Sequence, residues 1–202
     1  MGRRHPDVAR LSPERMGGEG AVLIEELKRV RLEGPKANAA ILVEGASDQR
    51  AVEALARRRH RDLAAEGTLV VPITGATNLD RFVDLLGSSG LGLSLVGLCD
   101  QAEADLFAAA LDPDRFFVCL RDLEEELIRA LGAEKVIELM AGQGQIGRFH
   151  RFQRQPAQRH KTLEQQVWRW LGNHKIRYAP LMVDALDLDK VPTPLEAVLA
   201  AV

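Results

Sequence analysis

The sequence has 202 residues, is 46% hydrophobic and 28% charged, and carries a formal net charge of -2, which predicts one globular domain or one domain with an extension. No run reaches the about 20 apolar residues of a membrane-spanning helix, and no apolar signal segment follows the first residues. Cys99 and Cys119 are the only cysteines, which argues against a disulfide-rich secreted scaffold, so we expect a cytoplasmic protein without a membrane partner. The scarcity of aromatic residues (six Phe, two Trp and one Tyr) argues against an extended base-stacking surface.

Two segments precede the first predicted strand. Residues 1–20 are rich in Arg, Pro and Gly without hydrophobic periodicity, and we interpret them as a flexible arm. Residues 21–36 place Val22, Leu27 and Val30 near one helical face and close with a Gly-Pro pair, which predicts a leading helix.

Short apolar runs then alternate with amphipathic segments. Strands are predicted at 39–43, 68–73, 92–99 and 115–120, and helices at 47–60, 78–86 and 102–111. Ser47 is the expected N-cap of the first of these helices. The alternation predicts an α/β fold with a mainly parallel sheet of about four strands and helices on both faces, in which ligands bind at the carboxyl ends of the strands.

From residue 122 onward the pattern is mostly helical. Helices are predicted at 122–131, 133–141, 162–171, 176–186 and 194–201. We therefore divide this part of the chain into an α/β domain at 37–142 and a basic helical C-terminal extension at 143–202. Residues 144–177 include eight basic residues and one acidic residue, a net charge of +7, which leaves -9 for the rest of the chain. Such a segment indicates either contact with a polyanion such as nucleic acid or an ordinary solvated helix face.

Acidic residues follow three of the four predicted strands. They are Glu44 and Asp48 after the first strand, Asp100, Glu103 and Asp105 after the third, and Asp122 and Glu124 after the fourth. Because parallel strands end at one edge of a sheet, we expect these carboxylates to lie close together, to repel one another and to attract a cation; hard oxygen ligands favour Mg²⁺ or Mn²⁺. Each turn taken singly is explained better by acids that cap a helix or interact with its dipole, and only the three turns together favour a cation site.

Residues 43–48 (Val-Glu-Gly-Ala-Ser-Asp) resemble the first motif of the TOPRIM domain, the metal-binding α/β module of topoisomerases, bacterial primases and several nucleases. Further elements are placed as in the TOPRIM region of OLD-family (overcoming-lysogenization-defect) nucleases: a strand ending in Asp100, a glycine-containing turn at 74–78, the acidic residues of 122–124, and a tail with Asn-His-Lys at 173–175 and Val-Pro-Thr-Pro at 191–194. The resemblance spans about residues 39–202 and implies a TOPRIM-like fold.

The resemblance also implies an activity and its residues. It implies a metal-dependent phosphodiester hydrolase in which Glu44 is the general base or a metal ligand and Lys175 contacts the scissile phosphate. The implied cofactor is Mg²⁺ or Mn²⁺, with the ligand set Glu44, Asp48, Asp100, Glu103 and Glu124. The basic segment supplies the predicted nucleic-acid contacts Arg148, Arg151, Arg154, Lys161 and Arg177.

One position departs from the family's pattern. The second Asp of the Asp-x-Asp element falls at Ala102, which cannot bind a metal, so Glu103 or Asp105 would have to replace it. If neither does, the second metal site is weakened or absent. The chain would then be a catalytically degenerate TOPRIM-like module that binds nucleic acid or regulates a separate ATPase. Nucleotidyl transfer, as in primases, is a third alternative, but we find no template-binding or zinc module in the sequence.

The expected partners follow from the same reasoning. Nucleic acid is the first, with DNA expected in preference to RNA, and a second copy of the chain is another candidate. Because no Gly-x-x-x-x-Gly-Lys-Ser/Thr motif is present, an ATPase partner would act in trans. We interpret the turn at 74–78 as a capped strand-to-helix turn rather than a phosphate site, and Cys99 as a buried thiol rather than a nucleophile.

Overall fold

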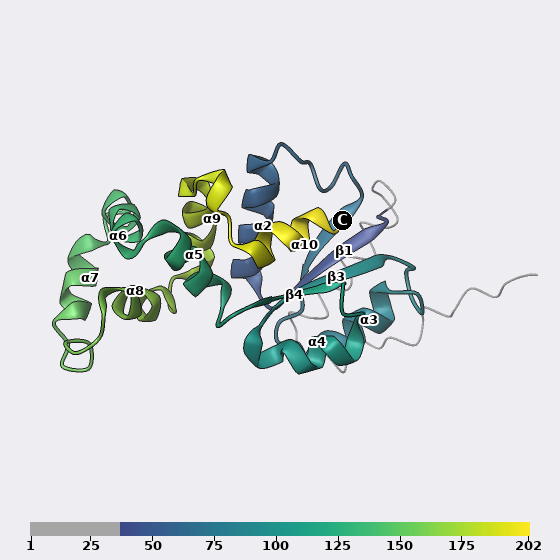
Figure 1. Ribbon diagram of the computed structural model, residues 1–202, viewed down its shortest axis with the longest axis horizontal. Coiled ribbons are helices and arrows are strands. Elements are labelled where there is room, and N and C mark those ends of the chain that lie inside the picture. Colours follow the sequence, from purple (N-terminus) through teal and green to yellow (C-terminus); the bar gives the residue numbers. More distant parts are fainter. Residues whose placement is uncertain (1–36) are drawn as a thin grey trace, which may run out of the picture.

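The computed structural model of this chain describes residues 37–202, so the predicted arm at 1–20 and leading helix at 21–36 lie outside the described residues (Figure 1). One sheet in this part of the chain is formed by β1 (Ala39–Val43), β2 (Thr68–Pro72), β3 (Ser94–Asp100) and β4 (Phe116–Cys119). The α-helices are α2 (Ala46–Arg58), α3 (Leu79–Leu86), α4 (Ala104–Ala110), α5 (Leu123–Leu131), α6 (Ala133–Gly142), α7 (Ile146–Gln153), α8 (Leu163–Leu171), α9 (Lys175–Ala185) and α10 (Thr193–Ala200). Three short 3₁₀ helices are η3 (Ala76–Asn78), η4 (Gln101–Glu103) and η5 (Leu188–Lys190).

The sheet is parallel throughout, with the strand order β2-β1-β3-β4. All five residues of β1 are buried, as expected for a central strand with helices on both faces. Val43 pairs with Pro72 of β2 and Leu98 of β3, and Asp100 pairs with Cys119 of β4. The strands that precede the three acidic turns are therefore neighbours, and the predicted parallel sheet is confirmed.

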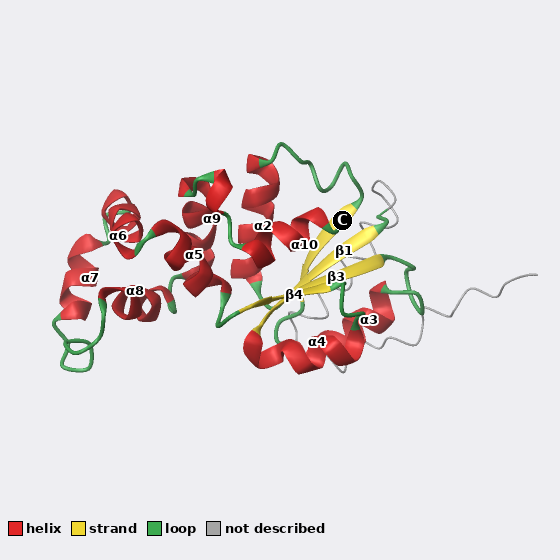
Figure 2. Cartoon of the chain, in the orientation of Figure 1, coloured by secondary structure: helices red, strands yellow, loops and turns green. Residues whose placement is uncertain are grey.

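Side chains of β1 alternate between two hydrophobic cores. Ala40 and Leu42 belong to the core that α3 and α4 close, whereas Ile41 and Val43 belong to the core that α2 closes. Figure 2 shows these two layers of helices on opposite sides of the sheet. Helix α4 approaches β3 closely because Gly97 has no side chain; an added Cβ would lie 2.6 Å from the ring of Phe107. Helices thus cover both faces, as predicted.

The helical C-terminal extension continues the larger core away from the sheet (Figure 1). Helix α9 packs along α2, and α10 returns to lie against β3 and β4. Arg58, the last residue of α2, donates hydrogen bonds to the carbonyl oxygens of Val183 and Leu186 at 2.8 and 2.6 Å. The extension is therefore bound to the α/β domain through shared apolar packing and through polar contacts at the end of α9.

Two local predictions need correction. Helix α7 was not among the predicted helices; it is short, Phe149 is its one fully buried residue, and Ile146 and Phe152 are partly buried against the same core. Ser47 is not an N-cap; the cap is Gly45, in extended conformation directly after β1. The carboxylate of Asp48 accepts a hydrogen bond from the N–H of Gly45 at 3.0 Å, so an acid in the first turn stabilises the helix start. Within residues 37–202 no helix has both the length and the apolarity needed to cross a membrane.

Candidate metal centre

Three carboxylates converge at the carboxyl edge of the sheet. Glu44 follows β1, Asp100 ends β3, and Glu103 ends η4. Each offers one oxygen, and these oxygens all lie within 4.8 Å of one another. The backbone N–H of Asp100 donates to Oε1 of Glu44 at 2.9 Å, which fixes one side of the Glu44 carboxylate. The adjacency of β1 and β3 thus joins residues that are far apart in the sequence.

The short helix η4 explains why Glu103 joins this cluster. A 3₁₀ helix has three residues per turn, so residues 100 and 103 lie on the same side of the chain. Ala102 is exposed, and Asp105 is exposed in the first turn of α4, outside the cluster. Oε2 of Glu103 is buried and receives no hydrogen bond from the described residues. It is therefore an acceptor for which a cation would be a suitable partner.

Burial and repulsion from neighbouring carboxylates raise the pKa values of Glu44 and Asp100. Burial and a hydrogen bond with Glu103 raise the pKa of Glu44 to about 7. Burial, followed by the charges of Glu44 and Asp48, raises the pKa of Asp100 to about 8. A bound divalent cation would favour the ionised forms instead, and carboxylate oxygens are the ligands that Mg²⁺ and Mn²⁺ prefer. The residues present therefore fit the metal that the sequence predicts.

Asp48 is electrostatically coupled to two groups of residues. Burial raises its pKa to about 7, and the charge of Glu124 adds to this rise while that of Lys175 opposes it. Its charge in turn contributes to the raised pKa of Asp100. Asp48 is not one of the three mutually close carboxylates. It interacts electrostatically both with Asp100 of that cluster and with the Glu124–Lys175 pair.

Glu124 and Lys175 form an ion pair between α5 and α9. Nζ of Lys175 donates to Oε2 of Glu124 at 3.0 Å, and the side chains are 40% and 1% exposed, respectively. Burial alone would lower the pKa of Lys175, but the charge and hydrogen bond of Glu124, together with the charges of Asp122 and Asp48, outweigh it and the pKa is raised. Lys175 is therefore a protonated, partly exposed cation at neutral pH. Oε1 of Glu124 is buried and has no donor among the described residues.

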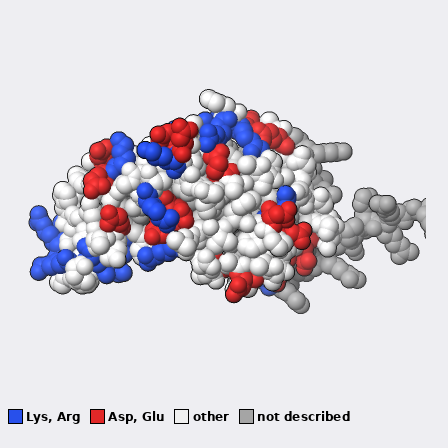
Figure 3. All heavy atoms as spheres, viewed as in Figure 1, with Lys and Arg blue, Asp and Glu red and all other residues white. Residues whose placement is uncertain are grey.

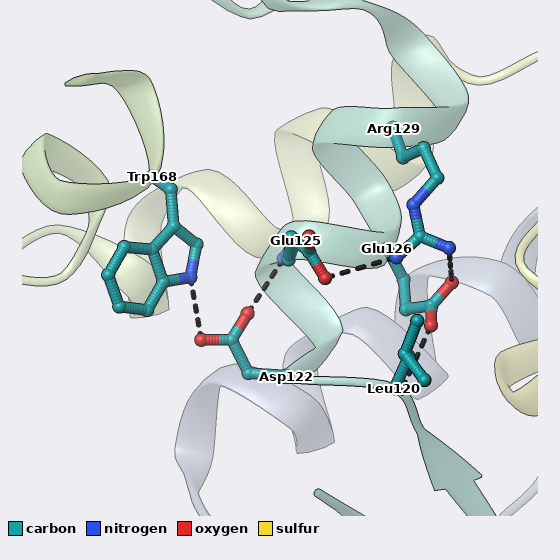
Figure 4. Close-up of polar contacts among 6 residues, drawn as sticks. All are labelled: Leu120, Asp122, Glu125, Glu126, Arg129 and Trp168. Carbon is teal, nitrogen blue, oxygen red and sulfur yellow. Dashed lines mark hydrogen bonds and ion pairs between the residues drawn. The ribbon is translucent and has the colours of Figure 1, made fainter. Parts of the chain in front are cut away.

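Asp122 uses both of its carboxylate oxygens to hold α5 against α8 (Figure 4). Oδ1 accepts the backbone N–H of Glu125 at 2.7 Å and caps α5, while Oδ2 accepts Nε1–H of Trp168 at 2.7 Å. The guanidinium of Arg121 lies 3.6 Å from the centre of the Trp168 ring. The third acidic turn thus contributes Glu124 to the site region and Asp122 to the connection with the extension.

Two pockets share the residues at the start of α9. The larger, about 680 Å³, lies between the first turns of α2, α7 and α9, and its basic lining residues are Arg148, His174, Lys175 and Arg177. The smaller, about 370 Å³, is lined by residues of α5, α7, α8 and α9 together with the loops before and after α8. Gly172, Asn173 and Lys175 line both.

The five predicted nucleic-acid contacts are not all in one place. Arg148 and Arg177 line the larger pocket, whereas Arg151 and Arg154 are exposed at the end of α7, and Lys161 precedes α8. On the face drawn in Figure 3, Lys and Arg gather at the end of the molecule formed by α7 and α8.

Two features of the larger pocket were not predicted from the sequence. His174, the N-cap of α9, contributes to its lining, and so do Ala46 and Ser47 in the first turn of α2. The signal available in the sequence was the position of the Asn-His-Lys segment at a helix start, where backbone N–H groups are free to bind anions.

Both cysteines are free and buried. Burial, with the charges of Glu44 and Asp100 next, raises the pKa of Cys99 to about 12, and burial also raises the pKa of Cys119. A neutral buried thiol is a poor nucleophile, which agrees with the interpretation of Cys99 as structural. The turn at 74–78 forms η3 and leads into α3, with the Asn78 side chain donating to the carbonyl of Ile73 at 3.1 Å.

Comparisons with known proteins agree with this geometry. Residues 37–101 match the family model of the overcoming lysogenization defect protein-like TOPRIM domain. The fold is similar to the C-terminal region of the Burkholderia pseudomallei OLD protein, with a TM-score of 0.61 and 18% identity over 82% of this chain and 96% of that one. It is also similar to the C-terminal region of the Xanthomonas campestris pv. campestris OLD protein, with a TM-score of 0.61 and 23% identity over 81% of this chain and 93% of that one. No curated protein matches the sequence.

The match to the family model includes β1, β2 and β3 with Glu44, Asp48 and Asp100, and the structural similarity extends over the helical extension. The predicted resemblance and fold class are therefore confirmed. Residues 37–101 are therefore similar to the TOPRIM domain of overcoming lysogenization defect proteins.

Proposed function

We propose that this chain is a Mg²⁺- or Mn²⁺-dependent hydrolase of phosphodiester bonds in nucleic acid, with DNA in preference to RNA as its substrate and the cytoplasm as its location. The observation that carries the proposal is the convergence of Glu44, Asp100 and Glu103 within 4.8 Å at the edge of a TOPRIM sheet. The basic pocket beside Lys175 supports a polyanionic substrate.

Each residue has a role that follows from its surroundings. Glu44, Asp100 and Glu103 would hold the cation, with Asp48 and Glu124 available for a second one. A bound divalent cation supplies charge stabilisation at the phosphoryl group and lowers the pKa of a bound water. Glu44 would accept the proton of the attacking water, a role supported by its position in the carboxylate cluster at the sheet edge. Lys175 provides a fixed positive charge for the phosphate.

The direct test is cleavage of supercoiled plasmid DNA with Mn²⁺, Mg²⁺ or EDTA. We expect nicking that requires the metal, and Glu44→Gln should slow it by about 10²-fold or more, because a required base and ligand is lost. Asp105→Asn is the matched control, since Asp105 is an exposed acid outside the cluster and its loss should leave the rate unchanged. Metal-independent nicking, or full activity in Glu44→Gln, would contradict the proposal.

A second function is favoured by Ala102, which lacks the carboxylate of the family pattern. In that case the chain is a nucleic-acid-binding or regulatory module of a separate ATPase, with weak or absent hydrolysis. The two functions predict different responses to substitution. If Glu103 replaces the missing acid, Glu103→Gln should abolish nicking as completely as Glu44→Gln. If the site is degenerate, Glu103→Gln should change little, and Ala102→Asp should raise a weak wild-type activity.

A further inference from the structure

The larger pocket beside Lys175 lies where two helices begin. It has a volume of about 680 Å³, and its lining includes Ala46 and Ser47 from the first turn of α2 and Lys175 and Ile176 from the first turn of α9. None of the three carboxylates that converge at the sheet edge belongs to this lining. The pocket is therefore distinct from the candidate metal centre.

Backbone N–H groups at both helix starts have no acceptor. Those of Ala46, Ser47, Lys175 and Ile176 form no hydrogen bond with the described residues, as is usual in the first turn of an α-helix. Each helix start also carries the positive end of the helix dipole, which favours an anion. Two helix starts in one pocket wall therefore offer four N–H donors and two positive dipole ends to the same ligand.

Ser47 adds a hydroxyl that has no partner. The residue is only 8% exposed, and its side chain forms no hydrogen bond with the described residues. Its Oγ is not among the unpartnered side-chain oxygens that are sealed from solvent, so it keeps accessible surface while the residue lines the pocket. A nearly buried hydroxyl in a pocket wall is placed to donate to a ligand oxygen. This hydroxyl distinguishes the pocket from an ordinary pair of helix starts.

The pocket is lined by basic residues and by no acidic residue of the described part of the chain. Arg148, Lys175 and Arg177 belong to the lining. The guanidinium groups of Arg148 and Arg177 form no hydrogen bond or ion pair with the described residues, whereas Lys175 is paired with Glu124. Guanidinium groups bind phosphate oxygens through two parallel hydrogen bonds. The donors and charges of the pocket therefore favour a phosphoryl group, which has more acceptor oxygens than a carboxylate and carries up to two negative charges.

The start of α9 is held in place before any ligand binds. The ring of His174, the N-cap of this helix, stacks on the ring of Trp170 with 4.0 Å between the centres and 5° between the planes. Its Nδ1 donates to the carbonyl oxygen of Trp170 at 2.9 Å, since that oxygen can only accept. Trp170 itself is buried. Donors that are already fixed lower the entropic cost of binding.

We propose that the larger pocket binds a phosphoryl group of the nucleic acid other than the phosphate that is cleaved. Its ligands are the Ser47 hydroxyl, Arg148, Arg177 and the free N–H groups at the starts of α2 and α9. The proposal deepens the proposed function, since it rests on nucleic acid as the substrate. The group is an internal phosphate of the bound strand or the phosphate of a strand end, which present the same anionic oxygens. Because Ser47 follows Glu44 by three residues, a phosphate held there fixes the register of the strand at the metal centre.

The first test uses inorganic phosphate and the full chain in EDTA, without nucleic acid. Correlation spectra of ¹H and ¹⁵N are recorded as phosphate is added at constant ionic strength, with acetate as the comparison anion. Phosphate should shift the signals of the four amides that lack an acceptor, and acetate should shift them less. The amide of Gln165, which already donates to Thr162 at the start of α8, should not move. Phosphate that leaves the four amides unchanged would overturn the proposal.

Substitutions then assign the shifts to this pocket. Ser47→Ala should weaken phosphate binding about 10-fold, the effect of losing one hydrogen bond to a charged group, whereas Ser89→Ala, at an exposed position after α3, should not. Arg148→Gln should also weaken it, and Arg151→Gln, on the same helix but outside the lining, should not. If Ser47→Ala fails to fold, the arginine pair decides. Unchanged phosphate binding in folded Ser47→Ala, or equal losses in the two arginine variants, would contradict the assignment.

Oligothymidines with a 5′-phosphate, a 3′-phosphate or neither distinguish the two sources of the phosphoryl group. Their binding is followed by fluorescence anisotropy in EDTA, so that no cleavage occurs. If a strand end occupies the pocket, one phosphorylated oligomer binds more tightly and Ser47→Ala removes the difference. If an internal phosphate occupies it, the three bind equally and Ser47→Ala weakens all three. Phosphate-induced shifts without metal-dependent nicking would refute only the proposed hydrolase, and nicking without those shifts would refute only this pocket.

Discussion

At the scale of single residues, the balance of charge around Glu44, Asp100 and Glu103 controls both stability and metal binding. Without a cation, Glu44 and Asp100 keep protons that they would lose in water, since burial and repulsion penalise their ionised forms. A divalent cation would favour the ionised carboxylates instead, because its positive charge offsets their negative charges. It would also be a partner for oxygens that lack a hydrogen-bond donor, such as Oε2 of Glu103.

Metal should therefore raise the thermal stability of the chain. Binding to the folded state at about 100 times its Kd adds about 2.7 kcal/mol, which corresponds to a rise in Tm of about 5–10 °C for a protein of this size. Asp100→Asn should remove most of the rise, and Asp105→Asn, outside the cluster, should retain it. Differential scanning calorimetry in EDTA and in millimolar Mn²⁺ measures both. A wild-type Tm that does not respond to Mn²⁺ or Mg²⁺ would rule out the metal centre.

Stability should also depend on pH in a direction that the raised pKa values fix. In the unfolded chain these carboxyls ionise near pH 4, but in the folded chain Glu44 and Asp48 do so at about 7 and Asp100 at about 8. Between these pH values the folded state binds more protons, so their stabilising contribution is complete below about pH 4 and is lost as pH rises towards 8.

Urea unfolding at pH 5 and pH 8 tests this dependence. In EDTA the free energy of unfolding should be lower at pH 8, Asp100→Asn should show a smaller decrease, and Mn²⁺ should restore stability at pH 8. A wild-type chain that becomes more stable from pH 5 to pH 8 in EDTA would show that these carboxyls are not protonated in the folded state.

The sequence was sufficient to place Glu44 and Asp100, because each follows or ends an apolar strand and parallel neighbours end at one edge. It could not choose between Glu103 and Asp105 as the third carboxylate. That choice depends on a single turn of 3₁₀ helix after β3, and hydrophobic periodicity does not distinguish such a turn from an extended one or from an α-helical start.

At the scale of elements, the position of α9 determines where Lys175 lies. Lys175 is its first residue, and the opposite end is held by Arg58, which donates to the carbonyls of Val183 and Leu186. Those carbonyls lie at the end of the helix, where backbone donors are few; the carbonyl of Val183 also accepts the N–H of Leu186 at 3.2 Å. The arginine therefore stabilises α9 on α2 and, through it, the placement of the lysine.

Arg58 and Arg57 form a matched pair for testing this role. Arg58→Met should lower the free energy of unfolding by about 2–3 kcal/mol, because two carbonyls lose hydrogen bonds from a charged donor. Arg57 makes an ion pair with Asp184 in which the side chains are 63% and 47% exposed, and Arg57→Met should cost at most about 1 kcal/mol. Urea titrations give both values. Equal losses in the two variants would mean that Arg58 has no special role at the end of α9.

Helix α7 shows which elements the sequence does not reveal. Long apolar stripes made α2, α5 and α8 predictable, and Thr162 at the N-cap with Gln165 three residues later marks the start of α8. Helix α7 buries Phe149 fully and Ile146 and Phe152 partly, so its apolar stripe is short and lies in an otherwise polar and basic segment. Its helical state depends on packing against α6 and α8, which single-sequence periodicity does not contain.

At the scale of the whole molecule, charge is divided between the two parts of the chain. Residues 144–177 carry a net charge of +7 and the remainder -9. The positive segment contributes Arg148, Lys175 and Arg177 to the larger pocket, and it borders the acidic sheet edge at Asp48 and Glu124. The positive segment would attract a phosphate backbone. The carboxylates at the sheet edge would repel it unless a cation bound between them offsets their charge.

Salt dependence tests whether this segment follows a phosphate backbone. Each phosphate contact contributes about -0.7 to -0.9 to the slope of log affinity against log salt concentration. Replacing Arg148, Arg151 and Arg154 together with Ala should weaken binding of DNA and make the slope shallower by about 2–3. The control replaces Arg50, Arg129 and Lys135, exposed basic residues outside the segment, and removes the same total charge. Filter binding from 50 to 300 mM salt gives the slopes. If both triple variants change the slope equally, net charge alone governs binding; if neither does, the basic residues of α7 only solvate its exposed face.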